Sequence, residues 1–168
     1  NKLYRKDKIT ENFRLNLDIG EDLLFNIKYL ENIEKISVTD KCLYNVCLDN
    51  ENSLNRKFRK DKLDVNLDLT DIEVQFCKKT YNNIKESNFL YNKYLLLLHA
   101  HLVQIGRIYN KNEIKNEIKK YSNENRVKNA CKYAKMDRID YKIFKNLVES
   151  KNYTLIYYFI KLKNVLIK

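Results

Sequence analysis

Glycine, proline and tryptophan are almost missing from this chain of 168 residues, which has two Gly, no Pro and no Trp. Glycine-rich phosphate loops, dinucleotide-binding fingerprints and nucleophile elbows each need several glycines close together. The chain has only Gly20 and Gly106, which are far apart, so all three motifs are excluded. The two histidines, His99 and His101, lie in one apolar stretch, where a Ser-His-acid or Cys-His-acid set would be cramped. The sequence therefore predicts a protein that is not an enzyme and that uses no cofactor or metal.

Long apolar runs are also missing. A bilayer-spanning helix needs ~20 apolar residues, and the nearest approaches, Tyr94–Ile105 and Tyr153–Ile160, are too short. We therefore expect a soluble protein with no transmembrane segment. An apolar fraction of 44% is ordinary for a globular chain, and the length fits one domain or one domain of two subdomains. Because the chain begins at Asn1 and not at Met, we expect a processed mature form or a fragment.

Apolar and polar residues alternate over much of Phe13 to Phe76, which is typical of strands that are buried on one face. The acids Asp64 and Asp68 then lie on the solvent face of a strand. The pattern predicts two hairpins, Phe13–Ile19 with Phe25–Tyr29 and Leu63–Leu69 with Ile72–Phe76. Between them it predicts two shorter strands, Lys35–Val38 and Cys42–Leu48, and a basic loop, Asn50–Lys62.

The apolar period becomes helical after Lys79. A buried central helix is expected between Ile84 and Ile108, and the last stretch, Tyr153–Ile167, suits either a strand or a helix, of which we prefer the helix. Asp140 is a plausible N-cap for the helix before it. The shorter apolar stripes are Ile114, Ile118 and Tyr121; Val127, Ala130, Cys131 and Ala134; and Ile139, Ile143, Phe144, Leu147 and Val148.

These two patterns together predict an α+β fold. Residues 1–79 would form a β-rich subdomain, an antiparallel sheet or small sandwich, and residues 80–168 a basic subdomain, a bundle of four or five helices.

Positive charge is concentrated in the second half of the chain. Residues 1–80 carry 15 basic and 15 acidic residues, whereas residues 81–168 carry 18 and 7 and hold the whole net charge of +11. The abundant Lys, Asn, Ile, Tyr and Phe are typical of an AT-rich genome, which makes basicity alone a weak indication of a partner. Codon usage acts on the whole chain, however, so it does not easily explain the asymmetry.

We therefore predict a non-catalytic binding module, a component of a larger assembly, whose basic helices dock an anionic macromolecule, either a nucleic-acid backbone or an acidic protein surface. Lys outnumbers Arg by 15 to 3 in residues 81–168, so contacts to phosphates are expected and base reading is not. Interleaved tyrosines, Tyr109, Tyr121, Tyr133 and Tyr141, could stack on unpaired bases. The predicted anion-binding residues, called here the basic surface, are Lys128, Lys132, Lys135, Arg138, Lys142 and Lys145. A similar ridge is expected at Lys111, Lys115 and Lys119.

The His99-Ala100-His101 triplet, within Leu95–Val103, resembles a motif of the replication and relaxase nucleases. In that family a strand carries His, an apolar residue and His, and a tyrosine and a lysine follow downstream. The matching positions in this chain are Tyr133 and Lys135. The resemblance implies a divalent metal on the two histidines and Tyr133 as the nucleophile. Residues two apart share a face on a strand but point about 200° apart on a helix, so this alternative requires an extended segment. The helical period favours His101 as a packed core residue.

Four cysteines, Cys42, Cys47, Cys77 and Cys131, are scattered along the chain without the paired spacing of a zinc site. Two disulfides would suit a secreted or surface domain that contacts another protein, which is the main alternative function. Four buried or reduced thiols would suit an intracellular protein, the location that we prefer.

Overall fold

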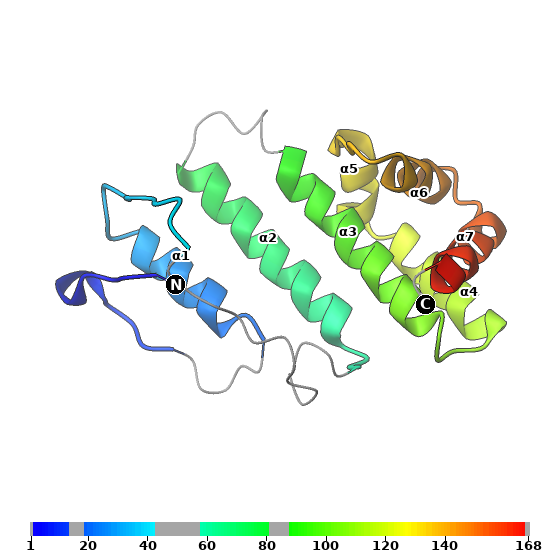
Figure 1. The fold of residues 1–168 in the computed structure, drawn as a ribbon, viewed down its shortest axis with the longest axis horizontal. Helices are drawn as coiled ribbons and strands as arrows, with labels where there is room; N and C mark the ends of the chain where they lie inside the picture. Colours follow the sequence, from blue (N-terminus) through cyan, green and yellow to red (C-terminus); the bar gives the residue numbers. More distant parts are fainter. Residues whose placement is uncertain (1, 14–18, 43–57, 81–87, 167–168) are drawn as a thin grey trace. The chain divides into compact units, whose positions relative to one another are not determined.

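The computed structural model describes residues 2–13, 19–42, 58–80 and 88–166, and helices are its regular elements (Figure 1). No strand occurs in these ranges, so the predicted α+β fold with an N-terminal sheet or sandwich is wrong. The elements are the short 3-10 helix η1 (Lys6–Lys8) and the α-helices α1 (Glu21–Leu30), α2 (Lys62–Thr80), α3 (Asn88–Ile105), α4 (Lys111–Ser122), α5 (Asn125–Tyr133), α6 (Ile139–Glu149) and α7 (Tyr153–Leu166).

The chain divides into two compact units, Asn1–Lys62 and Leu63–Lys168. The boundary predicted from the sequence came after Lys79, whereas here almost all of α2 belongs to the second unit. The acids of α2 are therefore part of the same unit as the basic helices.

The segment predicted as the second hairpin is the single helix α2. Leu63, Leu67 and Thr70 are buried, and steps of four and three residues place them on one helical face. Leu63 and Leu67 also fit a strand, because residues four apart share a face in both structures. Length separates the two cases, since α2 has 19 residues and strands usually have about 5 to 6.

The first predicted hairpin is wrong wherever it is described. Phe25, Ile27 and Tyr29 belong to α1, and Lys35–Val38 has no regular structure. The predicted strands at residues 14–18 and 43–48, and most of the loop that follows them, lie outside the described residues.

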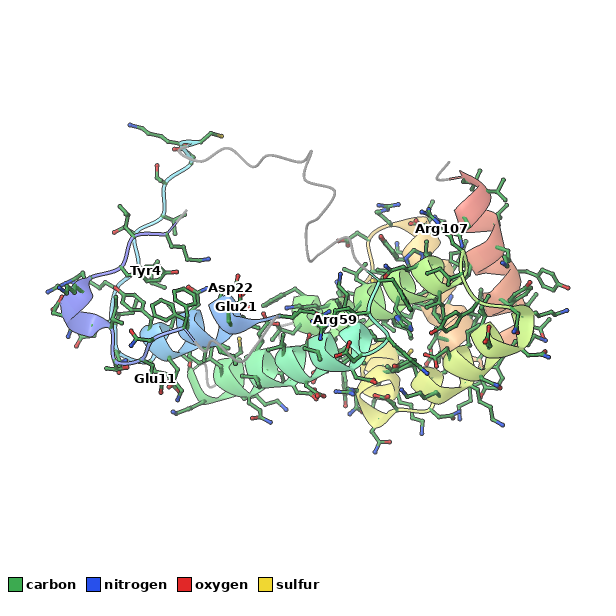
Figure 2. All side chains as sticks on the ribbon, turned by 90° about the horizontal axis from the view of Figure 1, so that it is seen from below. Tyr4, Glu11, Glu21, Asp22, Arg59 and Arg107 are labelled. Carbon is green, nitrogen blue, oxygen red and sulfur yellow. The ribbon has the colours of Figure 1, made fainter. Side chains whose placement is uncertain are left out.

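Tyr4 packs against α1 in the first unit, as Figure 2 shows. Its ring makes edge contacts with Phe25 and Tyr29, with centroids 5.2 and 4.9 Å apart, and its hydroxyl donates to Asn26 Oδ1 at 2.7 Å. Phe13 stacks on the same Phe25 at 4.3 Å. These aromatic contacts pack the N-terminal segment against Phe25 and Tyr29 of α1.

The second unit is built around α3, as the sequence predicts for a buried central helix. Leu95, Leu98, Leu102 and Ile105 are fully buried, and α3 packs against α4, α5, α6 and α7. None of the described helices combines the length and apolar character that crossing a bilayer requires.

The remaining helices follow the predicted apolar stripes with one correction. Asn110 caps α4 in a capping box with Glu113. The N-cap of α6 is Arg138 and not the predicted Asp140, which lies inside the first turn and forms ion pairs instead. The last stretch is the helix α7, the structure that we preferred for it.

Candidate anion-binding surface

The basic surface lies on α5, on the connection that follows it and on α6. Lys128 and Lys132 are exposed one turn apart on α5, whose opposite side buries Val127, Ala130 and Cys131. The apolar residues of this short helix face the core, and both ammonium groups are presented to solvent.

Hydrogen bonds hold the connection between α5 and α6 in place. Lys145 Nζ donates to the carbonyl oxygen of Ala134 at 2.9 Å, and Asn92 Nδ2 on α3 donates to that of Lys135 at 2.8 Å. Lys142 lies about one turn before Lys145 on α6 and is exposed. Lys145 is only half-exposed and its ammonium group donates inside the fold. It therefore connects α6 to the end of α5 and is less available to a partner than the exposed lysines.

Charged residues of α6 affect the pKa of Cys131 on α5. Burial, and then the Glu149 carboxylate, raise the pKa of the Cys131 thiol to about 11, and Lys145 opposes the shift. Both charged residues belong to α6 or its end, so the C-terminal part of α6 runs beside α5.

Arg138 is exposed but already has an acidic partner. Its Nε and Nη2 atoms donate to Asp140 at 3.2 and 2.8 Å, and its guanidinium lies 4.7 Å from the ring centre of Tyr141. Lys163 Nζ donates to the same Asp140 at 2.7 Å. Hydrogen bonds from Lys163 and then Arg138 lower the pKa of Asp140 to about 2, so the carboxylate stays charged and neutralises part of this corner.

Four lysines of the basic surface are exposed and form no ion pair within the described ranges. We call them the unpaired lysines, and they are Lys128, Lys132, Lys135 and Lys142.

Other basic residues of the second unit are neutralised by α2. Asp64 lies 3.3 Å from Lys120 Nζ, and Glu73 pairs with Lys93. Asp68 and Asp71 share Arg126, whose Nη1 lies 2.6 and 3.2 Å from their oxygens. Figure 1 shows α2, which carries these acids, beside α3. We call this row of contacts the ionic seam. It neutralises one basic residue on each of α3, α4 and α5 and does not include the unpaired lysines.

Sequence reasoning missed the ionic seam although a signal was present. Asp64, Asp68 and Asp71 are separated by four and three residues, so they share one face of a helix. Strand alternation also places Asp64 and Asp68 together, which is why the acids were assigned to a solvent face.

The predicted stacking tyrosines differ in their access to solvent. Tyr133 is 45% exposed and its ring lies 5.2 Å from that of Tyr91, so one aromatic pair borders Lys132. Tyr141 is half-buried against His99, and Tyr121 is buried beneath His101. Tyr109 is half-buried. Tyr133 is therefore the best placed of the four for an external contact.

The second predicted ridge is also partly engaged. Lys111 Nζ lies 5.7 Å from the ring centre of Tyr157, and Lys115 Nζ donates to Thr154 Oγ1 at 3.1 Å. Lys119 is exposed. These lysines of α4 lie beside α7 and do not continue the α5–α6 surface.

The two histidines point to different neighbours from the helix α3. His99 packs edge-on against Tyr141 and Phe144, whereas His101 contacts Tyr121 and lies 3.4 Å from Glu117. His101 is thus the packed core residue that the sequence predicts. The extended chelating pair that the nuclease resemblance requires is not formed.

Burial sets the protonation of both rings. It lowers the pKa of His99 to about 4, with Lys163 adding to the effect and Asp140 opposing it. It also lowers the pKa of His101, against the opposing effect of Glu117. Both rings are therefore neutral at pH 7. Within the described ranges, no group of three or more His, Cys, Asp or Glu residues is arranged to hold a metal ion.

Cys42, Cys77 and Cys131 are free thiols in the structure, and they are exposed, half-buried and buried in that order. Cys47 lies outside the described residues.

Comparison of the chain with known protein families, with curated proteins and with solved structures gives no match.

Proposed function

We propose that the chain is a non-catalytic binding module that docks an anionic macromolecule through the basic surface on α5 and α6, as one component of a larger assembly. The observation that carries the proposal is the set of unpaired lysines. The four acids of α2 pair with Lys93, Lys120 and Arg126 and with none of the unpaired lysines.

The charge of the second unit supports the same conclusion. Residues 63–168 carry 20 basic and 11 acidic residues, a net charge of +9, after the acids of α2 are included. Like charges repel one another at low ionic strength, so the four unpaired lysines on α5, on α6 and on their connection are stabilised by an anion that lies across them.

Lysine chemistry limits the kind of recognition. Each ammonium is a flexible point charge, which suits phosphate or carboxylate groups and does not suit bidentate reading of bases. A duplex or an acidic protein surface would be held by the sum of several screened contacts, and binding would weaken steeply with added salt.

Charge reversal tests the proposal. The variant Lys128→Glu, Lys132→Glu and Lys142→Glu should lose retention on a heparin column at ~0.15 M salt, conditions under which surface charges still attract. Because all three side chains are exposed, the melting temperature should change little.

A matched control separates a local surface from the total charge. Lys2, Lys8 and Lys41 are exposed lysines of the first unit, and reversing them changes the net charge by the same amount. Retention should persist in this control. Equal loss in both triple variants would mean that retention follows net charge alone, and the proposal would fail.

The stapled, secreted interaction domain is the alternative function. Its predicted sheet surface is replaced by α1 and α2 wherever the chain is described, and Cys42, Cys77 and Cys131 are free thiols. Counting free thiols in denaturant without reductant tests it, because four free thiols per chain contradict a stapled protein.

A further inference from the structure

The outer face of α7 is apolar along its length. Leu155, Tyr158, Leu162 and Val165 follow one another at steps of three, four and three residues, so they form one exposed stripe. The helix has two charged residues, and both are used inside the fold: Lys161 Nζ donates to the carbonyl oxygen of Gly106 at 2.7 Å, and Lys163 donates to Asp140.

The register of α6 against α7 extends this stripe. Lys163 contacts Asp140, and Phe159 stacks on Phe144 with centroids 5.9 Å apart, so the two helices run antiparallel. On α6, Ile139 and Ile143 directly precede the contact residues Asp140 and Phe144. On α7, Tyr158 and Leu162 directly precede the contact residues Phe159 and Lys163. In antiparallel helices, positions that precede the contact residues on both helices lie on the same side of the pair.

Six large side chains thus gather on one side of the α6–α7 pair, with exposed fractions between 46% and 75%. Scattered apolar residues are normal on a protein surface, but a contiguous patch that is bordered by charge is typical of an interface. We call it the apolar surface, and its members are Ile139, Ile143, Leu155, Tyr158, Leu162 and Val165.

Lysines border the apolar surface on both sides. On α6, the exposed Lys142 is one of the unpaired lysines and directly precedes Ile143. On the α4 side, Lys111 Nζ lies 5.9 Å from the ring centre of Tyr158, and Lys115 donates to Thr154 on α7. A partner therefore meets an apolar centre between two cationic borders.

We propose that the apolar surface and its lysine borders bind an acidic amphipathic α-helix of a partner protein. A third helix laid along two packed helices buries its apolar stripe against them, and its flanking carboxylates reach the lysines. This inference rests on the proposed function, because it names the anionic partner as a protein helix.

Charge decides among the other occupants. A second copy of this chain would bring lysine borders against lysine borders, which is unfavourable. A nucleic-acid backbone has no apolar stripe to cover Leu155, Leu162 and Ile143. A membrane surface would match both features in sign, but Tyr158 is the only aromatic member of the surface, whereas membrane-interface segments are rich in Trp and Tyr.

The test uses the full chain and three synthetic peptides of about 18 residues, the length of a five-turn helix. The first has leucines on one helical face and glutamates on the other, the second has the same composition in scrambled order, and the third has lysines in place of the glutamates. We expect the amphipathic acidic peptide to bind at least tenfold more tightly than either of the others in fluorescence anisotropy.

Variants locate the binding. Ile143→Ser with Leu162→Ser should weaken binding of the acidic amphipathic peptide at least tenfold, because both side chains are on the surface, and the circular dichroism spectrum should not change. The matched control, Ile36→Ser with Val38→Ser, replaces two exposed apolar residues of the first unit and should leave the affinity unchanged.

The outcomes separate this inference from the proposed function. If both acidic peptides bind equally and the Lys128, Lys132 and Lys142 reversal abolishes binding, the basic surface stands and the helix partner is wrong. If the wild type binds vesicles of phosphatidylserine and phosphatidylcholine and the variant Ile143→Ser with Leu162→Ser does not, the partner is a membrane and the inference is overturned. Unchanged affinity of the acidic amphipathic peptide for that variant also overturns it.

Discussion

Arg126 on α5 lies 2.6 Å from Asp68 and 3.2 Å from Asp71 on α2, and its Nε lies 2.6 Å from Glu124. One guanidinium thus collects three carboxylates. The contact joins α2 to α5, and it occupies the acids Asp68 and Asp71 with Arg126 and not with the unpaired lysines.

Replacing Arg126 by Met should destabilise the second unit by about 1 to 2 kcal/mol, because the half-buried Glu124 and the two aspartates lose their common partner. Lys128→Met is the matched control on the same helix. Lys128 is exposed and unpaired, so that change should stay within about 0.5 kcal/mol. Urea unfolding measures both, and equal effects would show that the ionic seam does not stabilise the fold.

His99 should make stability depend on pH below neutrality. Its pKa is lowered by burial, and by nearby Lys163, to about 4, so the unfolded chain takes up the proton first as the pH falls. Stability from this group is present above about pH 6.5 and is lost towards pH 4, by about 2 to 3 kcal/mol. His99→Phe keeps a ring against Tyr141 and Phe144 and should flatten the pH dependence of urea unfolding. An unchanged pH profile would contradict the burial of a neutral ring.

Gly106 directly follows α3 and lies against two residues of α7, Ile160 and Asn164. An added Cβ would lie 2.6 Å from Asn164 Nδ2 and 2.9 Å from Ile160 Cγ2. Asn164 is held by hydrogen bonds to Val103 and Arg107, so it does not move freely. Gly106→Ala should therefore cost about 1 to 3 kcal/mol in thermal or urea unfolding.

A double-mutant cycle checks this cause. Asn164→Ala removes the nearest atom, so the cost of Gly106→Ala should be smaller in that background. Strict additivity of the two changes would place the cost elsewhere.

The thiols should react in the order of their exposure. Cys42 is exposed, the pKa of Cys77 is raised by burial and by Glu73, and burial raises the pKa of Cys131 to about 11. Thiolates are the reactive form, so a short pulse of iodoacetamide should label Cys42 first and Cys131 last. Peptide mass spectrometry reads the order, and early labelling of Cys131 would contradict its position in the core.

The lysines illustrate what periodicity can predict. Helical spacing placed Lys128, Lys132 and Lys142 on solvent faces, where the structure has them. It could not show that Lys145 donates to Ala134, because that contact joins two elements whose packing no local pattern encodes.

The N-terminal half shows the limit of the same method. Residues four apart share a face in a strand and in a helix, so Leu63 and Leu67 satisfied the wrong pattern as well as the right one. Extending the window to Thr70 and Asp71 would have favoured the helix and, with it, the acidic stripe that neutralises Lys120 and Arg126. The apolar surface was equally hidden, since the exposure of Leu162 and Ile143 depends on how α6 and α7 pack.

The salt dependence of polyanion binding tests the unpaired lysines most directly. For a labelled single-stranded oligonucleotide, four engaged lysines predict a slope of about −3 for log K against log salt. The Lys128, Lys132 and Lys142 reversal should bring the slope near zero, whereas the Lys2, Lys8 and Lys41 reversal should keep it. The same slope in both variants would contradict a docking surface on α5 and α6.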